Sequence, residues 1–253
     1  MKIEICNASV GYSGKALVSG ISMVSEGNDI TAILGKNGCG KTTFVKSLIG
    51  NVPWLDGEVF IDGEKMKYSR KFWKIASYVS QDVDNVPYSV MDMVLLGTGV
   101  YKGLFSQPDE KDRKKVKSVL EKLNMERYAD MPYSVLSRGQ KQLVKIARAL
   151  VSSPQLLIMD EPESGLDMKN MKILLELIKK ISKDDGRQVI FITHNPQHAL
   201  MIADKALLFV NGKALWGDRD DILTKENLEE AYEVKLSLLR EDSECAVTFR
   251  LNK

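Results

Sequence analysis

The chain has 253 residues, of which 44% are hydrophobic and 28% are charged. This composition supports a buried core and argues against disorder over most of the length. The formal net charge is only +2, with acidic and basic residues interspersed, which disfavours a nucleic-acid binder that acts through bulk charge. The basic run at residues 111–117 is therefore predicted to be the solvated face of a helix.

The sequence also disfavours a secreted or membrane-spanning protein. Its three cysteines, Cys6, Cys39 and Cys245, are odd in number and far apart, which does not suit a disulfide framework. No basic start leads into an apolar signal segment, and no apolar run approaches the roughly 20 residues of a spanning helix. These features predict a cytoplasmic protein, and any membrane role is expected to come through a partner.

Taken in chain order, short β-rich apolar runs predict buried strands at residues 29–35, 155–162, 187–194 and 205–210. Helical patterns lie between these runs, so the predicted fold is α/β with a mainly parallel sheet. The runs "KIEICNASVGY" and "GEVFIDGEKM" alternate more, and the pair Asn211 and Gly212 is typical of a hairpin turn. An antiparallel β patch is therefore expected beside the parallel sheet.

Between Tyr88 and Val151 the pattern becomes helical. Residues 89–97, 109–123 and 137–151 carry helical spacing, and Asp109 is placed to cap the second segment. The sequence thus predicts one domain, 1–253, with a helical subdomain at about 88–150 inserted into the α/β core. A polar C-terminal extension at about 217–253 is expected to add a helix and a strand.

The stretch "LGKNGCGKTTF" fits the pattern G-x-x-x-x-G-K-[ST], with Gly35, Gly40, Lys41 and Thr42 in the required places. It follows a predicted strand and opens a predicted helix. Glycines let the backbone curl until consecutive N–H groups converge on an anion, and the helix adds the positive end of its dipole. Lys41 can reach the β- and γ-phosphates, and the Thr42 hydroxyl can ligate Mg²⁺.

This stretch is therefore predicted to bind a nucleoside triphosphate. The alternative is an ordinary glycine turn with a chance lysine. The expected binding residues are Gly35, Lys36, Asn37, Gly38, Cys39, Gly40, Lys41, Thr42 and Thr43.

The run "LLIMDEP" predicts the second part of such a site. Asp160 ends an apolar strand, where a carboxylate lies at the ligand-binding edge of a parallel sheet. We expect Asp160 to hold Mg²⁺ directly or through water, and Glu161 to polarise a water molecule for attack on the γ-phosphate. The alternative is a strand that ends in a solvated acidic turn.

Many classes of triphosphatase share those two patterns, and the segment 135–167 distinguishes between these classes. It contains "LSRGQ" before a short helix and "SGLD" immediately after the acidic strand, and together these resemble the ATP-binding subunit of ABC transporters. The resemblance covers residues 3 to about 217 and implies the ABC ATPase fold. It also implies ATP hydrolysis with ATP and Mg²⁺ as ligands.

Three single residues match further marks of that family. The resemblance implies that Tyr12 stacks on adenine, that Gln81 in "YVSQD" links Mg²⁺ to the helical subdomain, and that His194 in "FITHNP" contacts the γ-phosphate and the attacking water. Each has a structural alternative: a strand-end aromatic, a surface amide and a capping group. His198 is expected to lie on a helix surface or in the core.

The resemblance further implies a homodimer with ATP at the interface, since the serine loop binds the nucleotide of the opposite subunit. The residues expected in these contacts are Ser137, Gly139, Gln140 and Asp167. Two positions depart from the family pattern. Arg138 replaces a usual glycine, and its side chain can face a phosphate or point to solvent. Glu163 replaces a common threonine and is expected to lie outside the nucleotide contacts.

Residues 88–125, including the run "GLFSQPDEKD", resemble the corresponding segment of importers of iron–siderophore complexes, haem, cobalamin and molybdate. This resemblance implies an ATPase that lies peripherally on the inner face of the cell membrane. Its implied partners are integral-membrane permease subunits, contacted through the Gln81 loop and the helical subdomain, and indirectly a periplasmic or extracellular substrate-binding protein. An exposed apolar patch at 90–96 is the expected docking surface, and ordinary core burial is the alternative.

Other functions remain open at this point. A soluble ABC ATPase that remodels nucleic acid or ribosomes would share every motif, although no coiled-coil insertion, second ATPase half or nucleic-acid partner is expected from this sequence. An exporter ATPase with a separate membrane subunit is also compatible. A nucleotide-binding regulator without hydrolysis is disfavoured, because Glu161 and His194 are both present.

Overall fold

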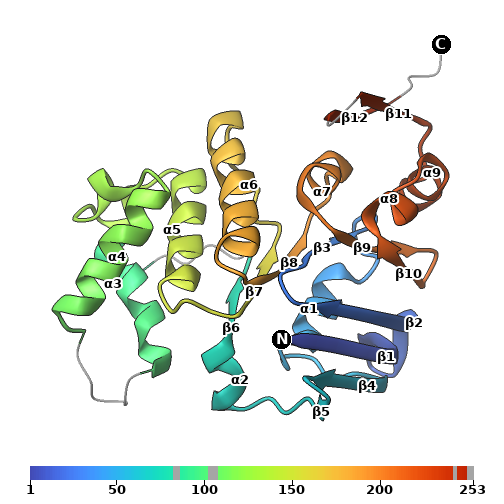
Figure 1. The fold of residues 1–253 in the computed structure, drawn as a ribbon, viewed down its shortest axis with the longest axis horizontal. Coiled ribbons are helices and arrows are strands. Elements are labelled where there is room, and N and C mark those ends of the chain that lie inside the picture. The colour runs from blue at the N-terminus through green and yellow to red at the C-terminus, as the bar shows by residue number, and fades with distance from the viewer. Residues whose placement is uncertain (82–85, 102–107, 242–243, 250–253) are drawn as a thin grey trace. The chain divides into compact units, whose positions relative to one another are not determined.

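The structure is a computed structural model that describes residues 1–81, 86–101, 108–241 and 244–249 (Figure 1). The chain forms two compact units, one made of Met1–Tyr68 with Gln188–Lys253 and the other of Ser69–Arg187. Two predicted features fall partly outside the described residues: positions 82–85 of the Gln81 loop, and positions 103–107 of the run "GLFSQPDEKD".

The first unit is built around a mixed sheet with the order β5-β4-β1-β2-β10-β9-β3-β8 (Figure 1). Its strands are β1 Lys2–Tyr12, β2 Lys15–Glu26, β3 Ile30–Leu34, β4 Asp56–Ile61, β5 Glu64–Lys65, β8 Gln188–Ile192, β9 Lys205–Val210 and β10 Lys213–Asp218. β3 is parallel to β8 and β9, whereas β1 is antiparallel to β2 and β4. Both the parallel core and the antiparallel patch are thus confirmed.

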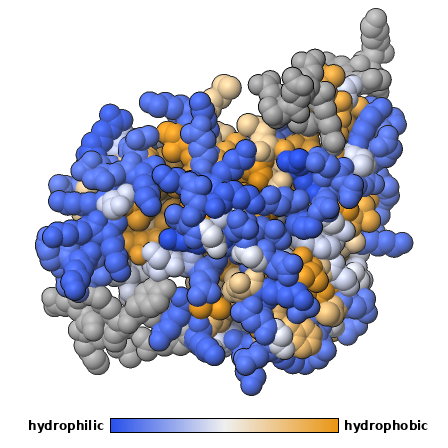
Figure 2. Space-filling model, in the orientation of Figure 1, coloured by the Kyte–Doolittle hydropathy of each residue, from blue (hydrophilic) through white to orange (hydrophobic). Residues whose placement is uncertain are grey.

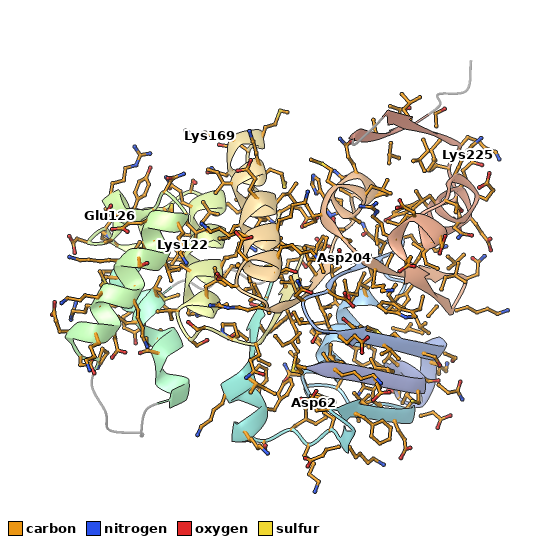
Figure 3. All side chains as sticks on the ribbon, in the orientation of Figure 1. Asp62, Lys122, Glu126, Lys169, Asp204 and Lys225 are labelled. Carbon is orange, nitrogen blue, oxygen red and sulfur yellow. The ribbon has the colours of Figure 1, made fainter. Side chains whose placement is uncertain are left out.

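The burial of these strands explains their sequences. Every residue of β3 and β8 is buried, which is why each reads as a continuous apolar run rather than an alternating one. The predicted turn between β9 and β10 is also confirmed, with Asn211 at φ 49° and Gly212 at φ 76°, the two left-handed residues of a tight hairpin. Two aspartates labelled in Figure 3 form hydrogen bonds to backbone N–H groups at the strand ends. Asp62 accepts from the Lys2 N–H at 2.7 Å, and Asp204 accepts from the Ile30 N–H at 2.8 Å.

The remaining elements of the first unit are the helices α1 Lys41–Leu48, α7 Pro196–Ile202, α8 Arg219–Ile222 and α9 Lys225–Tyr232, and the strands β11 Leu236–Glu241 and β12 Glu244–Phe249. The C-terminal prediction of a helix and one strand is wrong in part. β11 and β12 pair with each other in antiparallel register, so this extension holds two strands that form a sheet of their own.

The second unit contains two parallel strands, β6 Ala76–Val79 and β7 Leu156–Asp160. Its helices are α2 Arg70–Ile75, α3 Val90–Leu95, α4 Glu110–Lys122, α5 Arg138–Leu150 and α6 Met168–Lys183, with short 3-10 turns η1 Leu96–Tyr101, η2 Glu126–Tyr128 and η3 Tyr133–Val135. The helical character predicted for residues 88–151 is therefore confirmed where the structure describes this segment. The exact subdomain limits stay a prediction.

Local sequence explains where α4 begins and which face it buries. Asp109 and Asp112 form a reciprocal capping box, in which the Asp109 carboxylate accepts from the Asp112 N–H at 3.0 Å and the Asp112 carboxylate accepts from the Asp109 N–H at 2.9 Å. Val116 and Leu120 point inward, and the lysines of the basic run are exposed. The cap and the solvated face were both predicted from the sequence.

The prediction of an exposed apolar docking patch at residues 90–96 is wrong. Val90, Met93 and Val94 are at most 1% exposed, because α3 packs against both α4 and α5. Leu96, at 53% exposure, is the large apolar side chain of this segment that reaches the surface. Figure 2 shows that hydrophilic residues dominate the visible face, with apolar residues scattered among them. Among the described residues, no helix is long and apolar enough to cross a membrane.

Candidate functional site

The predicted phosphate-binding loop lies in the first unit, between the end of β3 and the start of α1. Gly35, Gly38 and Gly40 have φ angles of 140°, 77° and 112°, a region that favours glycine. A Cβ atom on Gly35 would lie 2.7 Å from the Cys39 sulfur and 2.8 Å from the Phe209 carbonyl oxygen. The glycine pattern therefore reflects both backbone conformation and close packing.

Lys41 folds back over this loop. Its side chain is only 5% exposed, and its Nζ donates to the carbonyl oxygens of Gly35 at 2.7 Å and Lys36 at 3.0 Å. These residues lie at the N-terminus of α1. The N-cap of this helix is Gly40, which provides no side-chain hydrogen bond to the first turn. A buried ammonium beside the positive end of a helix dipole is suited to bind a polyphosphate.

Cys39 lies inside the same loop and is partly buried. Burial raises the pKa of the Cys39 thiol, and the nearby charge of Lys41 opposes this shift without cancelling it. The thiol is therefore held mainly protonated at neutral pH, so it adds no negative charge to an anion-binding loop.

Tyr12 and His194 lie at the edges of this loop. Tyr12 ends β1 and is 51% exposed, and its hydroxyl accepts a hydrogen bond from the Thr43 hydroxyl at 3.4 Å. His194 follows β8, the parallel neighbour of β3, so its backbone leaves the same edge of the sheet as Gly35. Capping of α7 is performed by Asn195, whose side chain accepts from the Gln197 N–H at 3.0 Å, rather than by His194.

The other histidine is part of α7. His198 is partly buried, and its Nε2 lies 3.2 Å from the Asn195 side-chain nitrogen. This position agrees with the structural role predicted for His198.

In the second unit, the carboxyl ends of β6 and β7 bring Gln81, Asp160 and Glu161 together. Asp160 is the last residue of β7 and is 1% exposed, with the Tyr78 hydroxyl 3.5 Å from its Oδ2. Glu161 has φ 47°, an uncommon left-handed conformation for a glutamate, so the chain turns sharply there. The Gln81 Nε2 donates to the Glu161 Oε2 at 2.9 Å.

Ser137 caps α5 and is exposed at the start of that helix. The Ser137 hydroxyl accepts from the Gln140 N–H at 3.3 Å, and the Gln140 side chain accepts from the Ser137 N–H at 2.9 Å. Gly139 is buried against the turn that follows Glu161, because an added Cβ would lie 2.7 Å from the Gly165 carbonyl oxygen. Asp167 ends that turn and caps α6 by accepting from the Asn170 N–H at 2.8 Å.

Arg138 is exposed, and its guanidinium contacts the turn that follows β7. Its Nη2 donates to the Ser164 hydroxyl at 2.9 Å, and its side chain lies over Gly165. Arg138 thus connects the serine loop to the turn after β7, and this contact with Ser164 was missed because no pattern links the two positions. Glu163, the other departure from the family, is buried at 6% exposure.

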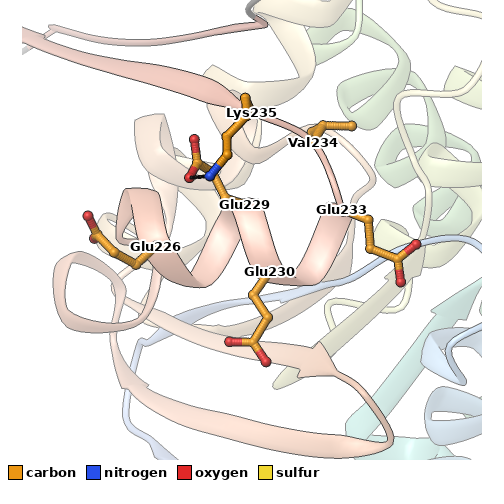
Figure 4. A pocket seen from close by; sticks show the side chains of 6 residues that line it. All are labelled: Glu226, Glu229, Glu230, Glu233, Val234 and Lys235. Atoms are coloured by element: carbon orange, nitrogen blue, oxygen red, sulfur yellow. Dashed lines mark hydrogen bonds and ion pairs between the residues drawn. The ribbon is translucent and has the colours of Figure 1, made fainter.

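A separate hollow of about 410 Å³ is lined by α9 and the residues after it (Figure 4). Glu229 and Lys235 form an ion pair in it at 3.1 Å, and Glu229 also accepts from the Leu236 N–H, which together hold the pKa of Glu229 below its usual value. The hollow is linked to the phosphate-binding loop by Glu233, which accepts from Lys36 at 2.5 Å. Both members of that link are well exposed, so the pair contributes little to stability.

Comparisons with known proteins agree with this geometry. The family model described as ABC transporter matches residues 18–164. An uncharacterized ABC transporter ATP-binding protein of Haemophilus influenzae is 37% identical over 95% of this chain and 93% of its own length. A manganese transport system ATP-binding protein of Bacillus subtilis is 32% identical over 94% and 95%. A Helicobacter pylori protein named for iron chelatin transport is 32% identical over 98% and 99%.

A solved structure described as an inward-facing metal-chelate type ABC transporter superposes with a TM-score of 0.85, covering 99% of this chain and 98% of the other at 29% identity. The chain therefore belongs to the ABC transporter family, as an ATP-binding subunit with the ABC ATPase fold. It is an ATPase, as its sequence predicted.

Proposed function

We propose that this chain powers an importer of a metal ion or metal chelate by binding and hydrolysing ATP. The observation that carries the proposal is the phosphate-binding loop, in which three glycines have positive φ and the buried Lys41 ammonium bonds to the carbonyl oxygens of Gly35 and Lys36. The importer class is supported by the relatives named for manganese and iron chelatin transport and by the metal-chelate type structure.

In this proposal the loop residues bind the phosphates of ATP, and Tyr12 stacks on the adenine through its exposed ring. Thr42, Asp160 and Gln81 would supply oxygen ligands for Mg²⁺. Their hydroxyl, carboxylate and amide oxygens suit this ion, which takes few protein ligands and completes its shell with phosphate and water. When bound, Mg²⁺ neutralises charge on the β- and γ-phosphates.

Hydrolysis then depends on Glu161 and His194. A water oxygen forms a bond to the γ-phosphorus as the bond to the β–γ bridging oxygen breaks, leaving ADP and phosphate. Glu161 orients the water and accepts its proton, while His194 donates to the γ-phosphate. Lys41 stabilises the charge that develops on the leaving oxygen.

We further propose that two copies bind ATP between them, with the serine loop of each copy facing the nucleotide of the other. The exposed Ser137, the N–H groups around Gly139, Gln140 and Asp167 would make these contacts. Support comes from the exposure of Ser137 at the N-terminus of the 13-residue helix α5, which is favourable for an anion. Each chain acts as a single domain, 1–253.

The proposed membrane partners are separate permease subunits, served in turn by a substrate-binding protein. Because α3 is buried, the contact is assigned to the Gln81 loop and to the exposed side chains of Tyr88, Leu96 and Met131, which are 44%, 53% and 40% exposed. The ATPase would thus lie on the inner face of the membrane through its partner.

The test is to purify this chain together with a candidate permease and to measure ATPase activity in liposomes. Manganese, ferric chelates and molybdate should be compared, each with the matching binding protein. Stimulation by one cargo class, absent in Glu161→Gln, is the expected result. Stimulation by nucleic acid or ribosomes in place of any cargo would contradict import and favour a soluble remodelling ATPase.

A further inference from the structure

A lysine lies within the buried face of α5. Lys145 is only 2% exposed, and its neighbours Val144 and Ile146 are fully buried. Its Nζ donates to the backbone carbonyl oxygen of Ser80 at 2.7 Å. α5 packs beside β6, and Ser80 is the residue that follows this strand (Figure 1).

Packing alone does not require a lysine at this position. Removing an ammonium group from water is costly, and an apolar side chain of similar volume in such a position is often neutral or stabilising. Methionine has a comparable length and packs well in irregular cores. The lysine is therefore better explained by what its charge-assisted hydrogen bond holds in place.

That bond holds the residue immediately before Gln81. The Gln81 side-chain amide donates to the Glu161 carboxylate at 2.9 Å. Two hydrogen bonds therefore connect Lys145 to Glu161 through the peptide group between residues 80 and 81 and the Gln81 side chain. The same helix begins at Ser137, two turns before Lys145. A displacement of the serine loop would thus reach the Ser80 carbonyl through a rigid helix.

We propose that Lys145 is a positioning residue, which fixes the Ser80 carbonyl so that Gln81 leaves β6 in the orientation that reaches Glu161. It couples the helix of the serine loop to the glutamate that orients water. This inference rests on the proposed roles of Gln81 and Glu161 in hydrolysis.

The experiment is a double-mutant cycle on the full-length protein with Lys145→Met, Gln81→Ala and the double variant, measured as kcat and KM for ATP. Lys145→Met should lower kcat about tenfold while KM changes less than about twofold, since the bond acts on Gln81 rather than on bound ATP. The double variant should be no slower than Gln81→Ala. Lys117→Met, an exposed lysine of α4, is the matched control and should leave kcat unchanged.

Four outcomes would overturn the inference. Multiplicative losses in the double variant would mean that Lys145 acts independently of Gln81, and an unchanged kcat in Lys145→Met would mean that it does not act at all. If Lys145→Met and Lys145→Gln both fail to fold, the role is structural. These three results leave the proposed function standing, whereas a fully active Gln81→Ala would remove the proposed role of Gln81 and the inference with it.

Discussion

The phosphate-binding loop of the first unit and the acidic turn of the second unit, residues 161–167 after β7, are built in different ways. The loop is set by backbone: glycines at positive φ, and Lys41 bonded to two carbonyl oxygens. The acidic turn is set by side chains, through the bond from Gln81 to Glu161 and the bond from Arg138 to Ser164.

The two regions should therefore tolerate substitution differently. A backbone conformation that needs glycine admits few substitutions, so its pattern is strict and readable. A side-chain contact can be replaced by another of similar reach, and the departures at Arg138 and Glu163 both lie in the second unit. Substitutions in the two regions should therefore fail in different ways.

Lys41→Ala in the loop should reduce activity more than the other substitutions below. Removing a buried cation from the phosphate contacts should lower kcat/KM by roughly 100- to 1,000-fold. Binding of a fluorescent ATP analogue should weaken in parallel, measured by titration. Near-normal binding would show that backbone N–H groups suffice and that the buried ammonium is not needed.

Gly139→Ala examines the packing of the second unit. Alanine usually stabilises a helix relative to glycine, but here its Cβ would meet the Gly165 carbonyl oxygen at 2.7 Å. We expect a net loss of about 1–3 kcal/mol, seen as a lower Tm, because the helix must shift. Gly99→Ala is the matched control, since no atom of the described residues lies within 4 Å of an added Cβ there. Equal Tm values for both variants would contradict the tight contact.

Cys39 offers a chemical probe of the loop without substitution. Burial raises the pKa of the Cys39 thiol, so at pH 8 a smaller fraction of this cysteine is thiolate than of an exposed cysteine. The thiolate fraction of Cys39 keeps growing as the pH rises further. Alkylation of Cys39 should be about tenfold slower than that of the exposed Cys6, measured by peptide mass spectrometry. ATP should slow it further. Faster labelling of Cys39 would mean that the loop is open.

Arg138→Ala should have the smallest effect. It removes one exposed hydrogen bond to Ser164, worth about 0.5–1.5 kcal/mol, and leaves Ser137 and Gly139 in place. ATPase activity should change less than about threefold, measured at saturating ATP. A much larger loss would indicate that the arginine contacts a phosphate, as one of its predicted orientations required.

Much of the fold could be predicted because the signals are local. The buried strands follow from continuous apolar runs, and the α4 start follows from the Asp109 cap. The phosphate-binding loop follows from its glycine spacing. Each depends on residues adjacent in sequence, so one chain is enough to find them.

The features that sequence reasoning missed depend on partners distant in the chain. The orientation of Arg138 is decided by Ser164, 26 residues away, and the burial of α3 by its packing on two other helices. A lysine in the apolar stripe of α5 was the available signal for Lys145, but its partner Ser80 lies 65 positions earlier. The positions of Gln81, Glu161 and His194 were predicted, and their catalytic roles stay predictions.

The most direct measurement of the central claim, that ATP is bound between two copies, is the mass of Glu161→Gln by size exclusion with light scattering. Loss of the carboxylate proposed to activate water should slow hydrolysis by about 100-fold or more while ATP still binds. With Mg-ATP the variant should therefore elute at twice the monomer mass, and with ADP it should return to one. A Glu161→Gln protein that binds ATP and stays monomeric, or that hydrolyses ATP at the normal rate, would contradict the account.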